Sequence, residues 1–233
     1  MSMQLAVIAG GNGYIGSALA TTFRNAGWRV ITLGRKAGST ADDMLCDITD
    51  EVSVQTTVAL IVAHHGPIDA CIHSASPALE RVTFLNASPE SFRAHLRTAV
   101  DGTYFLAQHV IPHMTANGAF IALTSNVVDH ISSDPKMGAY PFAKCEQQSV
   151  MQKIAVSDES QRVRVHTVMP HFLPGGLNND LPAAIRNHLA MQEDGTKNTL
   201  EDTAALVLTI ASNPLAYPSG TAIDPVTKNP RIL

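Results

Sequence analysis

Residues 7–23 read VIAGGNGYIGSALATTF, an apolar run that passes through a glycine-rich turn into a segment with a helical pattern. Gly10 permits the tight turn, Gly13 lets the backbone approach a pyrophosphate, and Gly16 lets the helix pack close to the preceding strand. Free N–H groups at the N-terminus of that helix attract an anion. The order of strand, glycine turn and helix therefore predicts a phosphate-binding site. The alternative is a glycine-rich turn that binds no ligand.

Apolar runs of strand length alternate with helix-length segments along the whole chain. We expect strands at 4–10, 28–34, 43–47, 69–75, 118–125, 163–170 and 220–224, and helices at 14–26, 50–65, 89–116, 140–157 and 201–212. The strands are apolar without alternation, which favours a parallel sheet covered on both faces. The sequence thus predicts one α/β domain over residues 1–233. Its expected architecture is a Rossmann-like, doubly wound parallel sheet of about seven strands with helices on both faces.

Two further patterns refine this expectation. The helical segment 89–116 has an apolar stripe at helical spacing. The residues of the stripe are Phe92, Leu96, Val100, Tyr104 and Ala107. Residues 171–199 have the least regular pattern and are rich in Pro, Gly, Asn and Asp. Because loops at the carboxyl ends of the strands form the crevice of a doubly wound sheet, this segment is a candidate substrate lid.

The composition is that of a globular protein, with 45% hydrophobic and 15% charged residues. The formal net charge is −4 and no cluster of Lys or Arg occurs, so a nucleic acid is not an expected partner. No apolar run reaches the length of a membrane span, and the N-terminal residues read as a strand, not as a signal peptide. Cys46, Cys71 and Cys145 are widely spaced, which predicts reduced thiols, no metal site and a cytoplasmic location.

The end of the second expected strand bears on the choice of nucleotide. Residues 32–38 read TLGRKAG, so Gly34 stands where an NAD site usually has an acidic side chain that binds the ribose hydroxyls. Arg35 and Lys36 follow, and a planar guanidinium suits a 2′-phosphate. NADP(H) is therefore favoured over NAD(H). The alternative is that both cations are solvated loop residues.

A tyrosine and a lysine stand four residues apart in AYPFAKCEQ, residues 139–147. Tyr140 and Lys144 share one face of a helix, and Pro141 is tolerated in the first turn because its missing N–H costs nothing there. The spacing by itself fits either a proton donor with its lysine or the first turn of an ordinary amphipathic helix. The choice between these readings depends on the rest of the chain.

The ordered motifs resemble the short-chain dehydrogenase/reductase family over nearly the whole chain, as a compact single-domain member with an atypical glycine motif. The matching stretches are the glycine turn 10–16, CDITD (46–50), HSAS (73–76), ALTSNVV (122–128), Tyr140 with Lys144, VMPHFLPGG (168–176), EDTAALVLTIAS (201–212) and SGTAID (219–224). The resemblance implies a catalytic set of Ser125, Tyr140 and Lys144. It also implies a homodimer or homotetramer and a small-molecule substrate.

The resemblance assigns further residues by position. Asp47 would hold the adenine amino group, and Pro170 and Leu173 would contact the nicotinamide. The complete cofactor-binding set that it implies is Gly10, Gly11, Asn12, Gly13, Tyr14, Ile15, Gly16, Arg35, Lys36, Asp47, Ser74, Ala75, Ser76, Tyr140, Lys144, Pro170 and Leu173. His171 and Phe172 are the candidate substrate residues at the mouth of the crevice, where His171 either contacts substrate or caps a loop.

The sequence departs from the family pattern at several positions. HSAS replaces a motif with two asparagines and a glycine, and His171 follows Pro170 where the family has glycine. Ala99 stands where many members have an asparagine that helps to relay protons. Ser125 precedes Tyr140 by fifteen residues, a slightly longer gap than usual, and Ser132 and Ser133 are alternative candidates in a loop.

These residues suit hydride transfer between a nicotinamide and a carbonyl or secondary alcohol. Tyr140 is expected to exchange the proton, with its pKa lowered by Lys144 and an oxidised nicotinamide, and Ser125 to orient the substrate oxygen. A second hypothesis is an NADP(H)-binding regulatory protein of weak or absent activity. A third is a nucleotide-sugar epimerase or dehydratase, against which the lack of an additional substrate domain argues.

Overall fold

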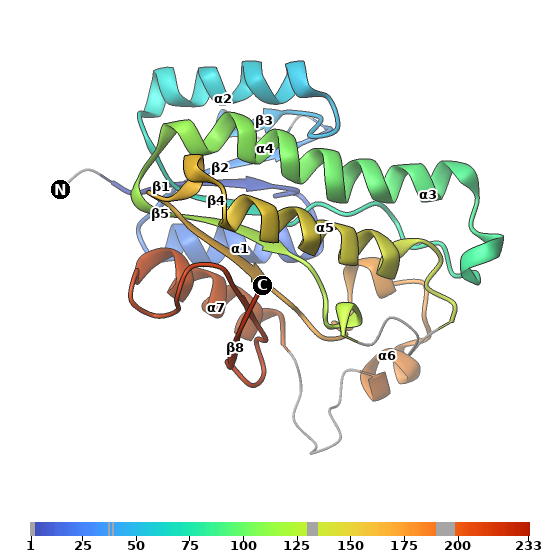
Figure 1. The fold of residues 1–233 in the computed structure, drawn as a ribbon. Helices are drawn as coiled ribbons and strands as arrows, with labels where there is room; N and C mark the ends of the chain where they lie inside the picture. The colour runs from blue at the N-terminus through green and yellow to red at the C-terminus, as the bar shows by residue number, and fades with distance from the viewer. Residues whose placement is uncertain (1–2, 37, 39, 130–134, 190–198) are drawn as a thin grey trace.

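The structure, a computed structural model, describes residues 3–36, 38, 40–129, 135–189 and 199–233 and contains one eight-stranded sheet (Figure 1). The strands are β1 Leu5–Ala9, β2 Arg29–Gly34, β3 Asp43–Leu45, β4 Ile68–His73, β5 Met114–Leu123, β6 Arg164–Val168, β7 Thr221–Ile223 and β8 Pro230–Ile232. Their order is β3-β2-β1-β4-β5-β6-β7-β8. Neighbouring strands are parallel from β3 to β7, and β8 is antiparallel to β7. The predicted parallel sheet is confirmed, but the estimate of about seven strands missed β8.

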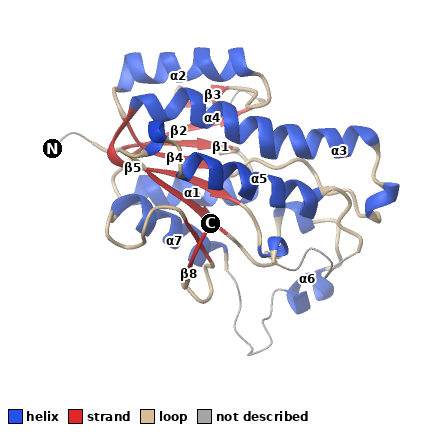
Figure 2. Ribbon diagram, viewed as in Figure 1, coloured by secondary structure: helices blue, strands red, loops and turns tan. Residues whose placement is uncertain are grey.

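Helices cover both faces of this sheet (Figure 2). The helices are α1 Tyr14–Asn25, α2 Glu51–His65, α3 Pro89–Leu96, α4 Gly102–Val110, α5 Tyr140–Ala155, α6 Ala183–Leu189 and α7 Leu200–Ser212. In the views of Figures 1 and 2, α2, α4 and α5 lie on one side of the sheet, and α1 and α7 lie on the other. Among the described residues no helix combines the length and apolarity that crossing a bilayer requires.

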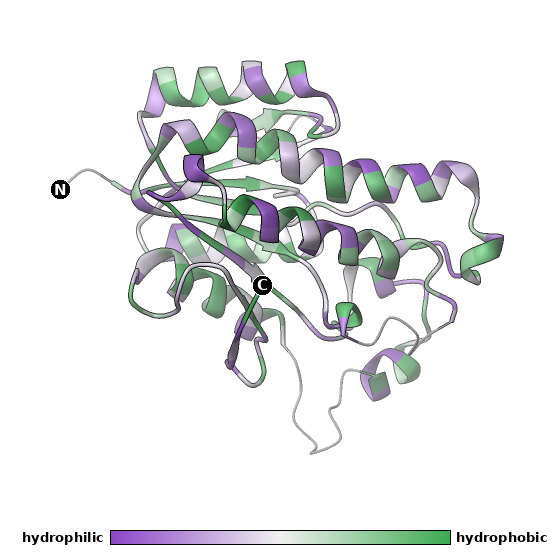
Figure 3. Cartoon of the chain, in the orientation of Figure 1, coloured by the Kyte–Doolittle hydropathy of each residue, from purple (hydrophilic) through white to green (hydrophobic). Residues whose placement is uncertain are grey.

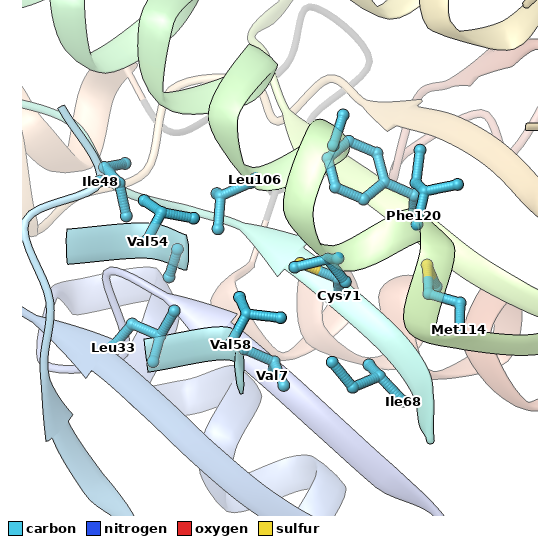
Figure 4. Packing of buried hydrophobic residues seen from close by; sticks show 14 of the residues in the cluster. Val7, Leu33, Ile48, Val54, Val58, Ile68, Cys71, Leu106, Met114 and Phe120 are labelled. Carbon is cyan, nitrogen blue, oxygen red and sulfur yellow. The ribbon is translucent and has the colours of Figure 1, made fainter. Parts of the chain in front are cut away.

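Two hydrophobic cores result, because successive side chains of a strand point to opposite faces. Val7 of β1 lies in one core with Leu33, Phe120 and Val58 of α2, on the face of the sheet that α2 and α4 cover (Figure 4). Its neighbour Ile8 belongs to the second core, which α1 and α7 cover. Hydrophilic and hydrophobic residues alternate along α3, α4 and α5 in Figure 3, as expected for helices with one buried face.

The long central helix differs from the prediction for 89–116. It consists of α3, a π-helical turn at Arg97–Asp101, α4 and a 3-10 turn at Ile111–His113, and Met114 already begins β5. The π turn contains extra backbone relative to an α-helix and rotates the residues that follow it. The predicted apolar stripe is therefore wrong in part, since Tyr104 is 53% exposed. The buried residues of this segment are His95, Ala99, Gly102, Thr103, Leu106, Ala107, Val110 and Ile111.

The predicted lid 171–199 contains a 3-10 turn at Gly176–Asn178 and helix α6, and its residues 190–198 lie outside the described part of the chain. The segment is held from two sides. Gly175 and Gly176 pack so closely on the ring of Tyr14 that a Cβ on either would overlap it. Arg81, on the loop after β4, donates hydrogen bonds to Asn178 and Asp180. These contacts place the first half of the segment beside the glycine turn.

A buried histidine in β6 predicts that the protein loses stability in mild acid. The His166 side chain is fully buried, and burial together with Arg164 lowers its pKa to about 4 from 6.5. As the pH falls from 6.5 to 4, His166 takes up a proton in the unfolded chain but stays neutral in the folded chain. Proton uptake then favours the unfolded chain, so the free energy of unfolding decreases. The H166V variant should lose roughly 3 kcal/mol less over this range than the wild type. Calorimetric melting as a function of pH measures the difference.

The matched control is the exposed His64 of α2, whose replacement by Gln should leave the pH dependence of the melting temperature as in the wild type. If H166V and the wild type lose stability in parallel between pH 6.5 and 4, the burial of a neutral His166 does not cause the acid sensitivity.

Candidate active site

A crevice of about 940 Å³ opens at the carboxyl ends of the parallel strands. Its volume suits a ligand of drug size or larger. Most of the predicted site residues line it. They are Gly10, Asn12, Gly13, Tyr14, Ile15, Arg35, Lys36, Asp47, Ser74, Ala75, Ser76, Ser125, Tyr140, Lys144, Pro170, His171, Phe172 and Leu173. The structure thus brings together residues from six strand ends, β1 to β6, the start of α5 and the predicted lid.

Gly11 and Gly16 do not line the crevice, because Gly11 packs against β2 and Gly16 packs against the turn itself. A Cβ on Gly11 would overlap the side chain of Thr32, and one on Gly16 would overlap the carbonyl oxygen of Gly10. Gly10 has a φ of +79°, a conformation that suits glycine, and its N–H donates to Leu33 O at 2.8 Å. The turn is therefore tied to the neighbouring strand β2.

The N-terminus of α1 faces this crevice. Gly13 is the N-cap residue, and no side chain of the described residues caps the helix. The first N–H groups of a helix carry partial positive charge and satisfy themselves with water or a ligand when no cap is present. With Gly13 lining the crevice, these donors can hold an anionic group such as a pyrophosphate.

The residues after β2 and β3 give this end of the crevice a positive charge. Arg35 and Lys36 are exposed and line the crevice. Asp47 is the one carboxylate among the described lining residues, and its Oδ1 atom accepts hydrogen bonds from the backbone and hydroxyl of Thr49 at 2.9 and 2.8 Å. Gly34 lies close to the amide of Asn12. No acidic side chain stands at the end of β2 among the described residues that line the crevice.

Ser125, Tyr140 and Lys144 meet on the other side of the glycine turn. Ser125 lies two residues past the end of β5 and caps a 3-10 turn at Asn126–Val128. Tyr140 is the first residue of α5, and its hydroxyl forms a hydrogen bond with Ser125. The Nζ atom of Lys144 lies 5.8 Å from the centre of the Tyr140 ring. The alternative candidates Ser132 and Ser133 lie outside the described residues.

The Lys144 ammonium is held in the interior by two hydrogen bonds. Only 5% of the residue is exposed. Its Nζ atom donates to Leu123 O at 2.7 Å and to Gln147 Oε1 at 2.8 Å. Burial disfavours the charged form and lowers the pKa of Lys144 to about 7. Near neutral pH this lysine is therefore close to the midpoint of its titration.

Gln147 is a site residue that the sequence reasoning missed. It is fully buried and donates from Nε2 to Thr103 Oγ1 at 3.1 Å, and that hydroxyl donates to Ala99 O at 2.6 Å. The chain of bonds fixes Lys144 against the central helix. The available signal was a glutamine three residues after the lysine, which places both on one helix face.

The sequence predicts that Lys144 and an oxidised nicotinamide lower the pKa of Tyr140. The described groups of the protein shift this pKa in the opposite direction. Burial raises the pKa of Tyr140 above its ordinary value, and the hydrogen bond with Ser125 opposes this effect only in part. The charge of Lys144 does not contribute to this shift. A lower value for the phenol requires a positive charge from outside the chain.

The HSAS segment frames the site. The backbone and hydroxyl of Ser74 both donate to Ala9 O, at 2.9 and 2.8 Å. His73 is fully buried and its Nε2 atom lies 2.9 Å from Thr98 O, so the ring donates to a carbonyl inside the π turn. Burial, together with the charge of Lys144, lowers the pKa of His73 to about 4. The imidazole is therefore neutral and serves to fix the π turn.

The segment after β6 forms the remaining wall. Pro170 O accepts from Asn126 N at 3.1 Å, which joins the walls after β5 and β6. His171 Nε2 lies 2.6 Å from Asp224 Oδ2, so a carboxylate after β7 orients this imidazole at the crevice. Arg81 also lines the crevice and was missed by the sequence reasoning. Among the described residues, no three His, Cys, Asp or Glu side chains gather in a metal-binding arrangement.

The chain is similar to known proteins over nearly its whole length. A family model described as enoyl-(acyl carrier protein) reductase matches residues 11–224. The cis-4-hydroxycyclohexanecarboxylate dehydrogenase of Sinomonas cyclohexanicum is 23% identical and covers 94% of each chain. The 2-(R)-hydroxypropyl-CoM dehydrogenase of Xanthobacter autotrophicus is 24% identical over 94% of this chain and 96% of its own length. The structure of 3-ketoacyl-(acyl-carrier-protein) reductase from Brucella melitensis complexed with NADH is 20% identical, has a TM-score of 0.82 and covers 96% of each chain.

The buried Lys144 predicts a rise in stability above pH 7. Its pKa is about 7 in the folded protein and 10.5 as an ordinary value, so between them the unfolded chain holds a proton that the folded chain has lost. Unfolding then becomes harder as the pH rises. Between pH 7 and about 8.5 the wild type should gain stability relative to a K144M variant, which lacks this group. Melting temperatures from scanning calorimetry provide the measurement.

Lys153 offers the control, since it lies exposed near the end of the same helix. The K153M variant should follow the wild-type curve. Parallel curves for K144M and the wild type would mean that Lys144 stays fully charged in the folded protein.

Proposed function

The chain belongs to the short-chain dehydrogenase/reductase family, and we propose that it is an NADP(H)-dependent oxidoreductase with Tyr140 as its acid and base. As a member of this family it is an NAD(P)-dependent enzyme that acts on alcohol or ketone substrates. The proposal extends this to the choice of nucleotide, the catalytic residues and a substrate that is a small organic carbonyl compound or secondary alcohol.

The observation that carries the proposal is the meeting of three polar groups in one crevice with the glycine turn. Tyr140, bonded to Ser125, lies beside Lys144, and all three line the crevice that Gly10 and Gly13 also line. A dinucleotide that places its phosphates at the N-terminus of α1 would extend toward this group. A chance Tyr-x-x-x-Lys match on an ordinary helix would not be expected to lie there.

The residues suit the proton side of a hydride transfer. A reduced nicotinamide supplies the hydride when it is bound. Tyr140 gives its hydroxyl proton to the substrate oxygen in reduction and takes a proton from the alcohol in oxidation. Ser125 donates a hydrogen bond to the same oxygen and so orients it and stabilises its developing charge. The ammonium of Lys144, where charged, favours the phenolate form of Tyr140 and can hold the ribose.

The preference for NADP(H) is inferred from charge. Arg35 and Lys36 line the crevice just after β2, and no acidic side chain stands among its described lining residues at that point. A carboxylate there would bind the two ribose hydroxyls of NAD and repel a 2′-phosphate. Two flexible cations instead attract the phosphate, and the guanidinium can bind it through two parallel hydrogen bonds.

The second candidate, an NADP(H)-binding regulatory protein, is favoured by Ala99 and by the HSAS segment. Within this segment the imidazole of His73 has a structural role, because it donates a hydrogen bond to the carbonyl oxygen of Thr98 in the π turn. The regulatory reading predicts NADP(H) binding by calorimetry without turnover of any ketone or alcohol. The enzymatic reading predicts that NADPH absorbance falls when a suitable carbonyl compound from a substrate panel is added.

Replacing the tyrosine hydroxyl tests the proposed chemistry. The Y140F variant keeps the ring and loses the proton, so kcat should fall by about 100-fold or more. The dissociation constant for NADPH should change by less than about threefold, because the phosphate site is untouched. Stopped-flow absorbance and calorimetry measure the two quantities. The control is Y104F on the exposed face of α4, and wild-type turnover in Y140F would refute the assignment.

Replacing the two cations tests the nucleotide preference. In a variant with R35S and K36S the KM for NADPH should rise by roughly 10- to 100-fold, the loss of charge-assisted hydrogen bonds to one phosphate. The KM for NADH should change little, since NADH lacks the 2′-phosphate. Arg29 lies at the opposite end of β2, so R29S is the control. An equal rise for both nucleotides would contradict the inferred role of Arg35 and Lys36.

A further inference from the structure

His95 is a buried histidine directly behind the tyrosine. It belongs to α3, and only 2% of it is exposed. Its ring packs edge-on against Tyr140, with ring centres 6.2 Å apart and an interplanar angle of 83°. The sequence analysis assigned it no role. A polar ring so close to the proton-exchanging group needs a physical explanation.

The hydrogen bonds of His95 determine which nitrogen carries the proton. Nδ1 lies 2.9 Å from Ser91 O, and a carbonyl oxygen can only accept, so Nδ1 is the protonated nitrogen. Burial lowers the pKa of His95, so the ring is neutral and Nε2 has a free lone pair. Nε2 has no hydrogen-bond partner among the described protein groups. Such a buried acceptor is expected to be satisfied by a water molecule.

A small cavity of about 10 Å³ lies beside this ring. Its polar lining residues are His95, Tyr140, Lys144, Ser76 and Thr98, and Ala75, Pro77, Ala99 and Ala143 complete the wall. The volume is close to what one water molecule needs. The lining is polar on two sides, because the ammonium form of Lys144 carries three N–H donors and, among the described residues, bonds through two of them, to Leu123 O and Gln147 Oε1.

We propose that His95 fixes one water molecule between its Nε2 atom and the Nζ atom of Lys144, and is thereby a positioning residue for Lys144. The water donates to the imidazole and accepts from the ammonium. Donor and acceptor are matched, because the tautomer of His95 leaves only an acceptor facing the cavity. The inference rests on the proposed function, in which Lys144 supports Tyr140.

The water has a direct electrostatic consequence. A water oxygen that accepts from the ammonium favours its charged form, so removal of the water should lower the pKa of Lys144 further. The other titratable groups that act on this centre are His73 at the end of β4, Tyr140 on α5 itself, and Glu80, whose charge acts on His95. His73 is neutral and bonded to Thr98 O. The unpaired Nδ1 of His73 could also accept, but His73 and Glu80 do not line the small cavity, whereas His95 does.

Two variants separate the water from the packing of the ring. H95F keeps a ring against Tyr140 and removes the acceptor, whereas H95Q restores an acceptor oxygen near the position of Nε2. The first measurement is a high-resolution crystal structure of the wild type and both variants. The second is the titration of Lys144 by the NMR shift of its ε-carbon. The third is the pH profile of kcat with NADPH.

We expect a water within hydrogen-bond distance of both His95 Nε2 and Lys144 Nζ in the wild type and none in H95F. In H95F the titration of Lys144 should move down by about one pH unit, and the alkaline fall in kcat should move with it. H95Q should return both to near the wild-type values. H166V, which changes a buried histidine far from the site, should shift neither.

The inference is overturned if the wild-type crystal contains no water that bridges the two nitrogens. It is also overturned if Lys144 titrates at the same pH in folded H95F as in the wild type. Should H95F fail to fold, the wild-type crystal and the H95Q titration decide the question. If the wild type neither binds NADP(H) nor reduces any carbonyl compound, the proposed function fails, while the bridging water and the titration still decide the role of His95.

Discussion

The parallel pairing of β1 with β2 and β4 is the constraint on which the site depends. Residues Leu5–Ala9 are buried on both faces and hydrogen-bonded on both edges. Parallel strands bring their carboxyl ends to one edge of the sheet, so the loops that follow them must share that edge. Gly10 N–H bonds to Leu33 O and Ser74 bonds to Ala9 O, which fixes the first crossover and the loop after β4 to the same strand end. Only glycine leaves room for so tight a turn.

Burial of one ammonium group organises the side of the crevice that holds Ser125 and Tyr140. Lys144 is removed from bulk water and donates hydrogen bonds to a carbonyl oxygen and an amide oxygen instead. Its burial lowers its pKa to about 7. The surrounding imidazoles of His73 and His95 are kept neutral by the same burial. Three basic groups can therefore lie together in the interior, because burial and the charge of Lys144 keep the two imidazoles neutral. The balance is sensitive to any additional charge or dipole, whether from a ligand or from a water molecule.

The π turn links this electrostatic centre to the fold. The regular α-helical hydrogen-bonding pattern is interrupted at Arg97–Asp101, and the ring of His73 donates a hydrogen bond to the carbonyl oxygen of Thr98. The carbonyl of Ala99 accepts from Thr103, whose hydroxyl accepts from Gln147 in turn. The distorted turn thus forms the wall against which Lys144 is positioned. A methyl group at Ala99 also leaves the space of the small cavity beside His95.

Much of the architecture could be read from the sequence, because it is encoded locally. Apolar runs, the glycine turn and the Tyr140–Lys144 spacing each reflect a period or a turn that neighbouring residues determine. What the sequence did not reveal arises between segments that are distant along the chain. The π turn changes which side of the central helix is buried. The short strand β8 forms by pairing with β7. The roles of Gln147, Arg81 and His95 depend on contacts with residues of other elements. The direction of the Tyr140 pKa and the titration of Lys144 depend on burial, and burial is decided only when the whole chain has folded.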